Sequence, residues 1–181
     1  MPPRVVTIVL SVLVFSAGLL VGGVSGWQLG REHAVQNARG LGIGQRPPDF
    51  AVQDLAGASQ SLQQHKGRVV VLHFWASWCG FCRSEIPELL ALHNEWSARG
   101  VDVLTVSIDR QPEQLRQFLA ATPLPYPIIV DQEQGDLLAS RFDVSGIPVT
   151  YIVDRDGRIA LHLQGASDIT AAVRETLGAS S

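Results

Sequence analysis

The spacing of hydrophobic residues changes along the chain. Continuous apolar runs predict buried strands, and apolar residues at helical spacing predict the helices between them. Residues 69–75 (VVVLHFW) form a largely apolar run rich in β-branched side chains, typical of a strand buried on both faces of a sheet. Residues 101–108 have the same character, and residues 126–130 are predicted as a third strand. Between these runs, helical spacing of apolar residues predicts helices over residues 80–99 and 112–121. The inner face of the first helix is predicted from Ile86, Leu89, Leu90, His93 and Trp96.

Turn residues mark both ends of the folded part and predict hairpins there. Residues 49–55 and 59–62 flank Gly57 and indicate a short N-terminal hairpin. Residues 149–153 and 158–163 flank the turn sequence DRDG, which predicts an antiparallel hairpin. Residues 134–142 are predicted as a short helix, and Asp168 is a good N-cap for a final helix through Leu177. The whole pattern predicts an α/β fold, with a mixed sheet and helices on both of its faces.

The first 30 residues predict a membrane anchor. Residues 5–27 contain no charged side chain, and as a helix they would span roughly 34 Å, enough for the hydrocarbon core of a bilayer. A cleaved signal peptide is the alternative, since Gly23-Val24-Ser25 would serve as a cleavage site, but the apolar run is longer than such a peptide needs. We expect an N-terminal transmembrane helix within residues 1–30, a flexible tether over 31–46 and a folded domain over 47–181.

Charge and composition exclude some classes of function. The chain has 14 Lys and Arg against 17 Asp and Glu, a formal net charge of −3 at pH 7, and it contains no basic run. These features argue against nucleic-acid binding. No Gly-rich phosphate-binding motif follows a predicted strand, so we expect no organic cofactor.

The only two cysteines, Cys79 and Cys82, lie in the stretch WASWCGFCRSE, where a predicted strand meets a predicted helix. As a structural staple, a disulfide across so short a loop would constrain the unfolded chain little. A metal site needs about four ligands, and the five histidines are scattered without finger-like spacing. A working redox pair is the interpretation that fits best, and we expect no metal at the site.

The predicted helix start gives the two cysteines unequal roles. Free backbone N–H groups and the helix macrodipole stabilise negative charge at this position, so the thiolate of Cys79 is favoured. Cys82 lies one turn deeper on the same side of the helix. It is placed to attack a mixed disulfide formed at Cys79 and to release the product.

The same stretch carries a resemblance to a known family. FWASWC with its CxxC pair, after a strand and before a helix, is similar to the thioredoxin superfamily, and in particular to the membrane-anchored TlpA/ResA-like thiol–disulfide oxidoreductases of bacteria. Pro87 stands where such proteins kink the active-site helix. SGIPVT at residues 145–150 resembles their loop with a cis-proline opposite the cysteines, and residues 112–130 resemble their central helix-and-strand insert. The resemblance covers roughly residues 47–177 and implies a thioredoxin-like sheet.

The resemblance also implies roles for Pro148 and Glu85. The Ile147–Pro148 bond is expected to be cis, with the neighbouring backbone pairing with an extended substrate; the alternative is a trans proline at a strand start. Glu85, one helical turn after Cys82, matches a glutamate of the ResA-like pattern. If buried, Glu85 would have a raised pKa and exchange protons with Cys82, whereas the alternative is a solvated helix carboxylate.

Several further side chains are expected around the cysteines. Trp75 and Trp78 should pack around the site, and substrate contacts are predicted for Trp78, Gly80, Phe81 and Ile147. His73 departs from the pattern, because thioredoxin has a buried Asp there and the family often has Asn. It would either hydrogen-bond near Cys82 or have its ring satisfied by backbone groups, and we expect the second.

The function implied by the resemblance is that of a dedicated protein-disulfide reductase outside the cytoplasmic membrane. Its expected substrates are disulfides in apocytochrome c or other secreted proteins, and an integral-membrane electron donor would re-reduce it. Arg4 and the amino terminus before the apolar span favour a periplasmic catalytic domain. Because the fold does not set the direction of electron flow, an extracytoplasmic disulfide oxidase or isomerase remains open. A Cu(I)-binding module also remains open, whereas a peroxiredoxin is disfavoured because that branch lacks this CxxC.

Overall fold

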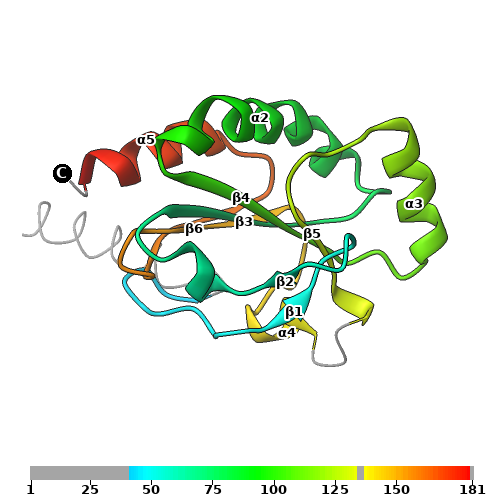
Figure 1. Cartoon of the computed structure of the whole chain (residues 1–181), viewed down its shortest axis with the longest axis horizontal. Coiled ribbons are helices and arrows are strands. Elements are labelled where there is room, and N and C mark those ends of the chain that lie inside the picture. Colours follow the sequence, from blue (N-terminus) through cyan, green and yellow to red (C-terminus); the bar gives the residue numbers. More distant parts are fainter. Residues whose placement is uncertain (1–40, 134–136, 180–181) are drawn as a thin grey trace, which may run out of the picture. The chain divides into compact units, whose positions relative to one another are not determined.

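A five-stranded sheet forms the centre of a computed structural model that describes residues 41–133 and 137–179 (Figure 1). Its strands are β3 (Val69–Trp75), β4 (Val101–Ser107), β5 (Ile128–Val130), β6 (Val149–Val153) and β7 (Ile159–Gln164). Their spatial order is β5–β4–β3–β6–β7. β3, β4 and β5 run parallel, whereas β6 pairs antiparallel with both β3 and β7. The predicted mixed sheet is therefore confirmed.

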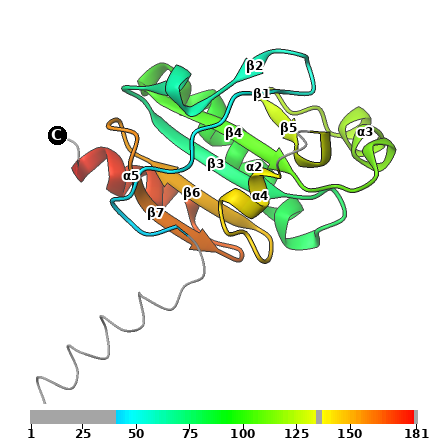
Figure 2. The same cartoon turned by 90° about the horizontal axis from the view of Figure 1, so that it is seen from below.

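Helices cover both faces of this sheet (Figures 1 and 2). They are α2 (Gly80–Trp96), α3 (Pro112–Ala121), α4 (Leu138–Arg141) and α5 (Ile169–Ala179). One apolar core lies under α2 and α5, a second lies on the opposite face with α4, and a third joins the start of α2 to α3 and β5. Shorter elements complete the fold: β1 (Val52–Gln53), β2 (Ser59–Gln60), η1 (Leu62–His65), η2 (Ser97–Arg99) and η3 (Asp131–Glu133).

The central strand β3 divides its side chains between the two faces. All of its residues are buried, as its apolar sequence predicts. Val69 and Val71 pack beneath α2 and α5, whereas Leu72 and Phe74 pack on the α4 side. Because successive strand residues point to opposite faces, His73 lies on the same face as α2. A polar ring is thus held in the interior directly below the helix that carries the cysteines.

Some predicted boundaries and one predicted face differ from the structure. The first helix ends at Trp96 rather than Arg99, and a 3₁₀ turn leads to Gly100, whose φ of 88° only glycine adopts readily. Leu92, rather than His93, completes its buried face with Leu89. The third strand starts at Ile128, because Pro127 has no N–H to donate to the sheet.

The helix predicted over residues 134–142 is shorter in the described part, where α4 covers Leu138–Arg141. Residues 134–136 of that prediction lie outside the described residues. The N-terminal hairpin is confirmed, with β1 and β2 antiparallel, and so is the C-terminal hairpin of β6 and β7. The Asp168 carboxylate accepts the Ala171 N–H at 2.8 Å, which confirms the predicted N-cap.

Residues 41–46, which the sequence assigns to the tether, lie against the domain. Gly44 N–H donates to the Ile159 carbonyl at 2.7 Å, and Ile159 N–H donates to the Gln45 carbonyl at 2.9 Å. The backbone N–H of Leu41 donates to the Tyr151 hydroxyl at 3.2 Å. The rest of the predicted tether and the predicted anchor lie outside the described residues. Within residues 41–133 and 137–179, no helix is long and apolar enough to cross a membrane.

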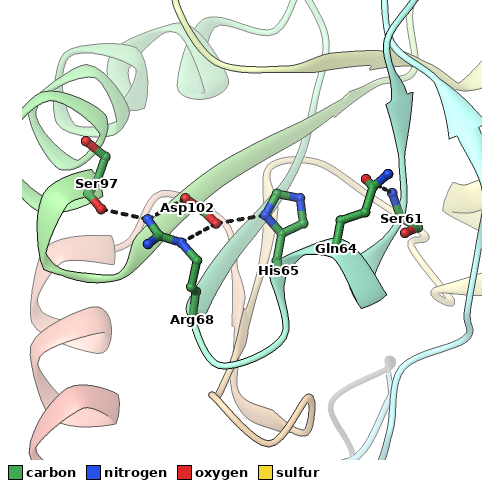
Figure 3. A network of polar contacts seen from close by, with 6 residues as sticks. All are labelled: Ser61, Gln64, His65, Arg68, Ser97 and Asp102. Atoms are coloured by element: carbon green, nitrogen blue, oxygen red, sulfur yellow. Dashed lines mark hydrogen bonds and ion pairs between the residues drawn. The ribbon is translucent and has the colours of Figure 1, made fainter.

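A polar network ties the beginning of β3 to β4 (Figure 3). Arg68 donates to both carboxylate oxygens of Asp102, at 2.7 and 2.8 Å, and to the Ser97 carbonyl at 2.6 Å. His65 Nδ1 lies 2.8 Å from the same carboxylate. Burial alone would raise the pKa of Asp102, but the hydrogen bonds from Arg68 and His65 outweigh it and hold the pKa below its ordinary value. This network marks the amino end of β3, whereas the cysteines follow its carboxyl end.

Candidate active site

A disulfide joins Cys79 and Cys82 at the first turn of α2, with the two Cα atoms 5.3 Å apart. Cys79 is the N-cap residue, in extended conformation, and its sulfur accepts the Cys82 N–H at 3.2 Å. The site therefore has the predicted strand-to-helix geometry. When the disulfide is reduced, this N–H and the helix dipole favour a thiolate at Cys79.

The two sulfurs differ in their access to solvent. Cys79 is 8% exposed, whereas Cys82 is completely buried. Two large aromatic side chains next to them in the sequence are exposed to solvent: Trp78 is 56% exposed and Phe81 is 71% exposed. A disulfide partner can therefore reach Cys79 first, and the exposed aromatics offer apolar surface at the point of contact.

The loop before Cys79 is held near the sheet by hydrogen bonds to the buried carboxylate of Asp109. Asp109 accepts the backbone N–H of Ser77 at 2.9 Å and its hydroxyl at 2.7 Å. The Ser107 hydroxyl donates to the same carboxylate at 2.7 Å. This carboxylate is not among the site residues predicted from the sequence. Its signal is an Asp two positions after the buried strand β4, at the sheet edge where α/β proteins place their sites.

Pro148 lies at the start of β6, after a cis peptide bond with Ile147, so the predicted cis bond is confirmed. Its carbonyl accepts the Gly165 N–H at 2.9 Å. Ile147 is partly buried and packs against the apolar cluster that contains Cys79 and Cys82. The structure thus brings Ile147 to the apolar cluster that contains the cysteine pair, although they are far apart in sequence.

Glu85 is buried, not solvated, with 5% exposure. Its Oε1 accepts the backbone N–H of Ser167 at 3.0 Å, just before α5. Burial raises the pKa of Glu85, the Ser167 hydrogen bond lowers it in part, and the nearby Glu88 carboxylate raises it further. The net effect is a carboxyl group whose pKa is higher than ordinary, one helical turn from Cys82.

His73 is also buried, and its partner is a side chain rather than the expected backbone. Nδ1 lies 2.9 Å from the Thr150 hydroxyl on β6. Nε2 lies 3.9 Å from Glu85 Oε2, and neither atom has a hydrogen-bond partner among the described residues. Burial lowers the pKa of His73 to about 3, so the ring is neutral at physiological pH.

The predicted insert helps to close the site. Its helix α3 places Phe118 against Trp75 in an edge-to-face arrangement, with ring centroids 5.7 Å apart. The Arg83 guanidinium lies over the same Phe118 ring at 5.6 Å. Trp75 is buried as expected, whereas Trp78 points to solvent. Among the residues that the structure describes, no group of three or more His, Cys, Asp or Glu side chains is arranged to hold a metal ion.

Comparison with known proteins places this geometry in a family. The profile described as "AhpC/TSA family" matches residues 43–162. The chain belongs to this family. The thioredoxin-like protein YneN of Bacillus subtilis is 34% identical over 143 residues, which cover 78% of this chain and 82% of YneN. The thiol-disulfide oxidoreductase ResA of Bacillus cereus is 26% identical over 147 residues, covering 81% and 83% of the two chains.

Solved structures of such proteins have the same fold. A candidate thiol:disulfide interchange protein DsbE from Chlorobium tepidum superimposes with a TM-score of 0.68 at 31% identity, covering 77% of this chain and 97% of that one. The AhpC/TSA assignment, these relatives and the cysteine pair together identify a thiol–disulfide oxidoreductase with a thioredoxin-like fold. The predicted resemblance to the TlpA/ResA-like branch is confirmed.

Proposed function

We propose that this oxidoreductase works as a reductase of protein disulfides outside the cytoplasmic membrane, with apocytochrome c or another secreted protein as substrate. The observation that carries the reaction is the pairing of a reachable Cys79 at the N-cap of α2 with a fully buried Cys82. This asymmetry suits a sequence in which one sulfur meets the substrate and the other resolves the complex.

The reaction has two exchange steps. The Cys79 thiolate attacks a substrate disulfide, which breaks the substrate S–S bond, forms a mixed disulfide and releases one substrate thiolate. Cys82 then loses its proton and attacks Cys79, which forms the Cys79–Cys82 disulfide and releases the second substrate thiolate. The substrate gains two electrons, and the cysteine pair loses them. A membrane-embedded dithiol donor would return these electrons in a third exchange.

Glu85 is the proposed proton acceptor for Cys82. It is buried one helical turn away on the same face of α2, and its raised pKa brings it closer to the pH at which it would work. Glu85→Gln should alter the pH dependence of thiol titration, and an unchanged profile would discard this role.

The proposed substrate surface consists of Trp78, Gly80, Phe81 and Ile147, beside Pro148. The exposed aromatics support it, as does the packing of Ile147 against the cysteine cluster. An extended substrate segment would pair with the backbone at Ile147, as in short forms of strand addition.

The extracytoplasmic location rests on the apolar segment within residues 1–30, which would hold the domain on the periplasmic side. A reporter enzyme fused after Ser181 should be active only outside the cytoplasmic membrane. Activity only in the cytoplasm would overturn the topology.

The reduction potential of the Cys79–Cys82 pair tests the direction of electron flow. A reductase should equilibrate in dithiothreitol or glutathione buffers near thioredoxin, at about −270 mV, and an oxidase near about −120 mV. A value near the second figure would favour the oxidase or isomerase and contradict the proposal. Two measurements separate catalysis from Cu(I) storage. Turnover on an oxidised CxxCH peptide supports catalysis, whereas copper bound to the reduced protein without such turnover supports storage.

A further inference from the structure

Two buried polar atoms face each other beneath the cysteine pair. Nε2 of His73 on β3 lies 3.9 Å from Oε2 of Glu85 on α2. The side chains are only 1% and 5% exposed, and neither of these atoms has a hydrogen-bond partner among the described residues. Leaving a buried polar atom unpaired costs free energy, so such atoms call for an explanation in the function of the site.

The other atoms of the two groups are held in place. Nδ1 of His73 lies 2.9 Å from the Thr150 hydroxyl, and Oε1 of Glu85 accepts the Ser167 N–H at 3.0 Å. The ring and the carboxyl group are therefore each fixed on one side and free on the side where they meet. A distance of 3.9 Å is too long for a hydrogen bond, and a shift of about 1 Å would form one.

When Glu85 is ionised, the donors and acceptors of Glu85, His73 and Thr150 allow only one set of hydrogen bonds among them. A carboxylate can only accept, so Nε2 of a neutral His73 must carry the ring proton. Nδ1 then accepts the proton of the Thr150 hydroxyl, which can donate or accept as its neighbour requires. In this arrangement the Thr150 hydroxyl donates to Nδ1 and so supports the Nε2–H tautomer of His73 that an ionised Glu85 requires.

We propose that His73 is a positioning residue for proton transfer from Cys82: its Nε2–H donates to Glu85 Oε2 and stabilises the ionised carboxylate that takes the Cys82 proton. During resolution the Cys82 proton moves to Glu85, and the Cys82 sulfur attacks Cys79 of the mixed disulfide. The substrate leaves as a thiolate, and the proton on Glu85 later returns to solvent or to the reduced pair. This inference rests on the proposed role of Glu85.

The surroundings of Glu85 make such a donor necessary. Burial raises the pKa of Glu85 and favours its neutral form, which cannot accept a proton. The titratable groups packed around it are Cys82 and Glu88 from α2 and His73 from β3, while Asp168 before α5 is bonded to the Ala171 N–H. Glu88 repels a second negative charge. Among the described residues, the donors placed to favour the carboxylate are therefore Ser167 N–H and His73.

The test measures the resolving step directly as a function of pH. Reduced protein is mixed in a stopped-flow instrument with one equivalent of 5,5′-dithiobis(2-nitrobenzoate), a small disulfide. The first release of thionitrobenzoate reports attack by Cys79, and the second reports resolution by Cys82. In the wild type, the acid limb of the second phase should follow the ionisation of Glu85.

His73→Phe should move this acid limb to higher pH, so that the second phase, compared at a pH on the limb, slows about tenfold for each pH unit of displacement. The first phase should not change. His73→Gln, which keeps an N–H donor, should leave the acid limb of the second phase much closer to its wild-type pH. In a Glu85→Gln background, His73→Phe should have no further effect, because both act on one group. Val71→Ala, on the same face of β3, is the control for a general loss of stability.

The outcomes separate this inference from the proposal on which it rests. If Glu85→Gln changes the second phase but His73→Phe leaves its acid limb in place, the role of His73 is overturned and that of Glu85 stands. If Glu85→Gln changes nothing, both fail. If His73→Phe does not fold, Thr150→Val replaces it: removing the hydroxyl should shift the limb in the same direction, and an unshifted limb overturns the inference.

Discussion

The Asp109 carboxylate accepts both the backbone N–H and the hydroxyl of Ser77, at 2.9 and 2.7 Å, with both residues buried. Ser77 precedes the reactive Cys79 by two positions, and Asp109 follows β4. A carboxylate just beyond the neighbouring strand therefore helps to determine where the cysteine loop leaves the sheet. The position of Cys79 depends on this contact as well as on the helix that follows.

Asp109→Asn should destabilise the protein and slow attack by Cys79. The amide keeps the volume, but it loses the charge and places N–H donors among three protein donors. Hydrogen bonds to charged groups contribute about 1.5–3 kcal/mol each, so we expect a loss of roughly 2–3 kcal/mol in urea unfolding. Ser77→Ala, which removes only the hydroxyl, should lose less. Equal stability of Asp109→Asn and wild type would contradict the role of this carboxylate.

Cys79 should react with iodoacetamide in the reduced protein at least about tenfold faster than Cys82, because it is the more accessible of the two sulfurs and is stabilised as a thiolate by the helix start. Mass spectrometry of the alkylated peptides measures the ratio. Cys82→Ser should accumulate a mixed disulfide with substrate, whereas Cys79→Ser should form none. Faster alkylation of Cys82 would reverse the assigned roles.

Trp78→Ala and Phe81→Ala should raise the KM for a protein disulfide roughly tenfold each, because truncating one interface aromatic costs about 1–2 kcal/mol. Reaction with a small aromatic disulfide should keep its rate, since the sulfurs are untouched. Both side chains are largely exposed, so the unfolding midpoint should not move. Leu55→Ala, at an exposed apolar residue on the β1–β2 hairpin, is the control. Unchanged KM values would remove these residues from the substrate surface.

His73 should make the folded state less stable in acid. Its pKa is lowered to about 3 by burial, against an ordinary value of 6.5, so the unfolded chain binds the proton first as the pH falls. Stability is thus lost from about pH 6.5 downward, at up to about 1.4 kcal/mol per pH unit. Urea unfolding should show a shallower decline for His73→Gln between about pH 6.5 and pH 4.

Over part of this pH range, Glu85 changes the stability of the folded state in the opposite direction to His73. Its raised pKa gives stability that is complete below its ordinary value of 4.5 and is lost as the pH rises through the folded-state pKa. His73→Gln is the variant to compare with wild type at each pH, because the glutamine keeps an N–H donor for Glu85 while removing the group that titrates. Parallel profiles for the two proteins would show that His73 is not buried as a neutral ring.

Asp102→Asn should cost about 1–3 kcal/mol of stability, because Arg68 loses a charged partner that it contacts twice. The pKa of Asp102 is lowered, so its contribution is present above its ordinary value of 3.8 and lost as the pH falls through the lower folded-state pKa. Disulfide exchange rates should not change, because this network lies at the other end of β3. A large loss of activity at unchanged stability would contradict that separation.

Features that depend on local pattern could be predicted from the sequence. β3 was visible as an apolar run, and the CxxC pair was visible at its junction with α2. The face of His73 followed from strand alternation. Its partner Thr150 could not be predicted, because the contact depends on the register between β3 and β6, strands that are distant in sequence.

Contacts made by backbone or across long separations were missed for the same reason. Asp109 contacts Ser77 across 32 residues. Ser77 lies within FWASWC, but Asp109 belongs to no recognisable motif. Residues 41–46 have no hydrophobic period, yet Gly44 and Gln45 attach to Ile159 through main-chain hydrogen bonds that carry no side-chain signal.

Two glutamates of α2, Glu85 and Glu88, give the start of α5 a part in the redox site. Glu85 accepts the N–H of Ser167, and Glu88 accepts that of Thr170 at 2.6 Å, so α2 is joined to the start of α5. During synthesis, Cys79 and Cys82 leave the ribosome long before these donors exist. A nascent chain that ends before Ser167 contains the whole CxxC motif but leaves the Glu85 carboxyl without its fixed partner. The redox site is complete only when Ser167 and the start of α5 have been made.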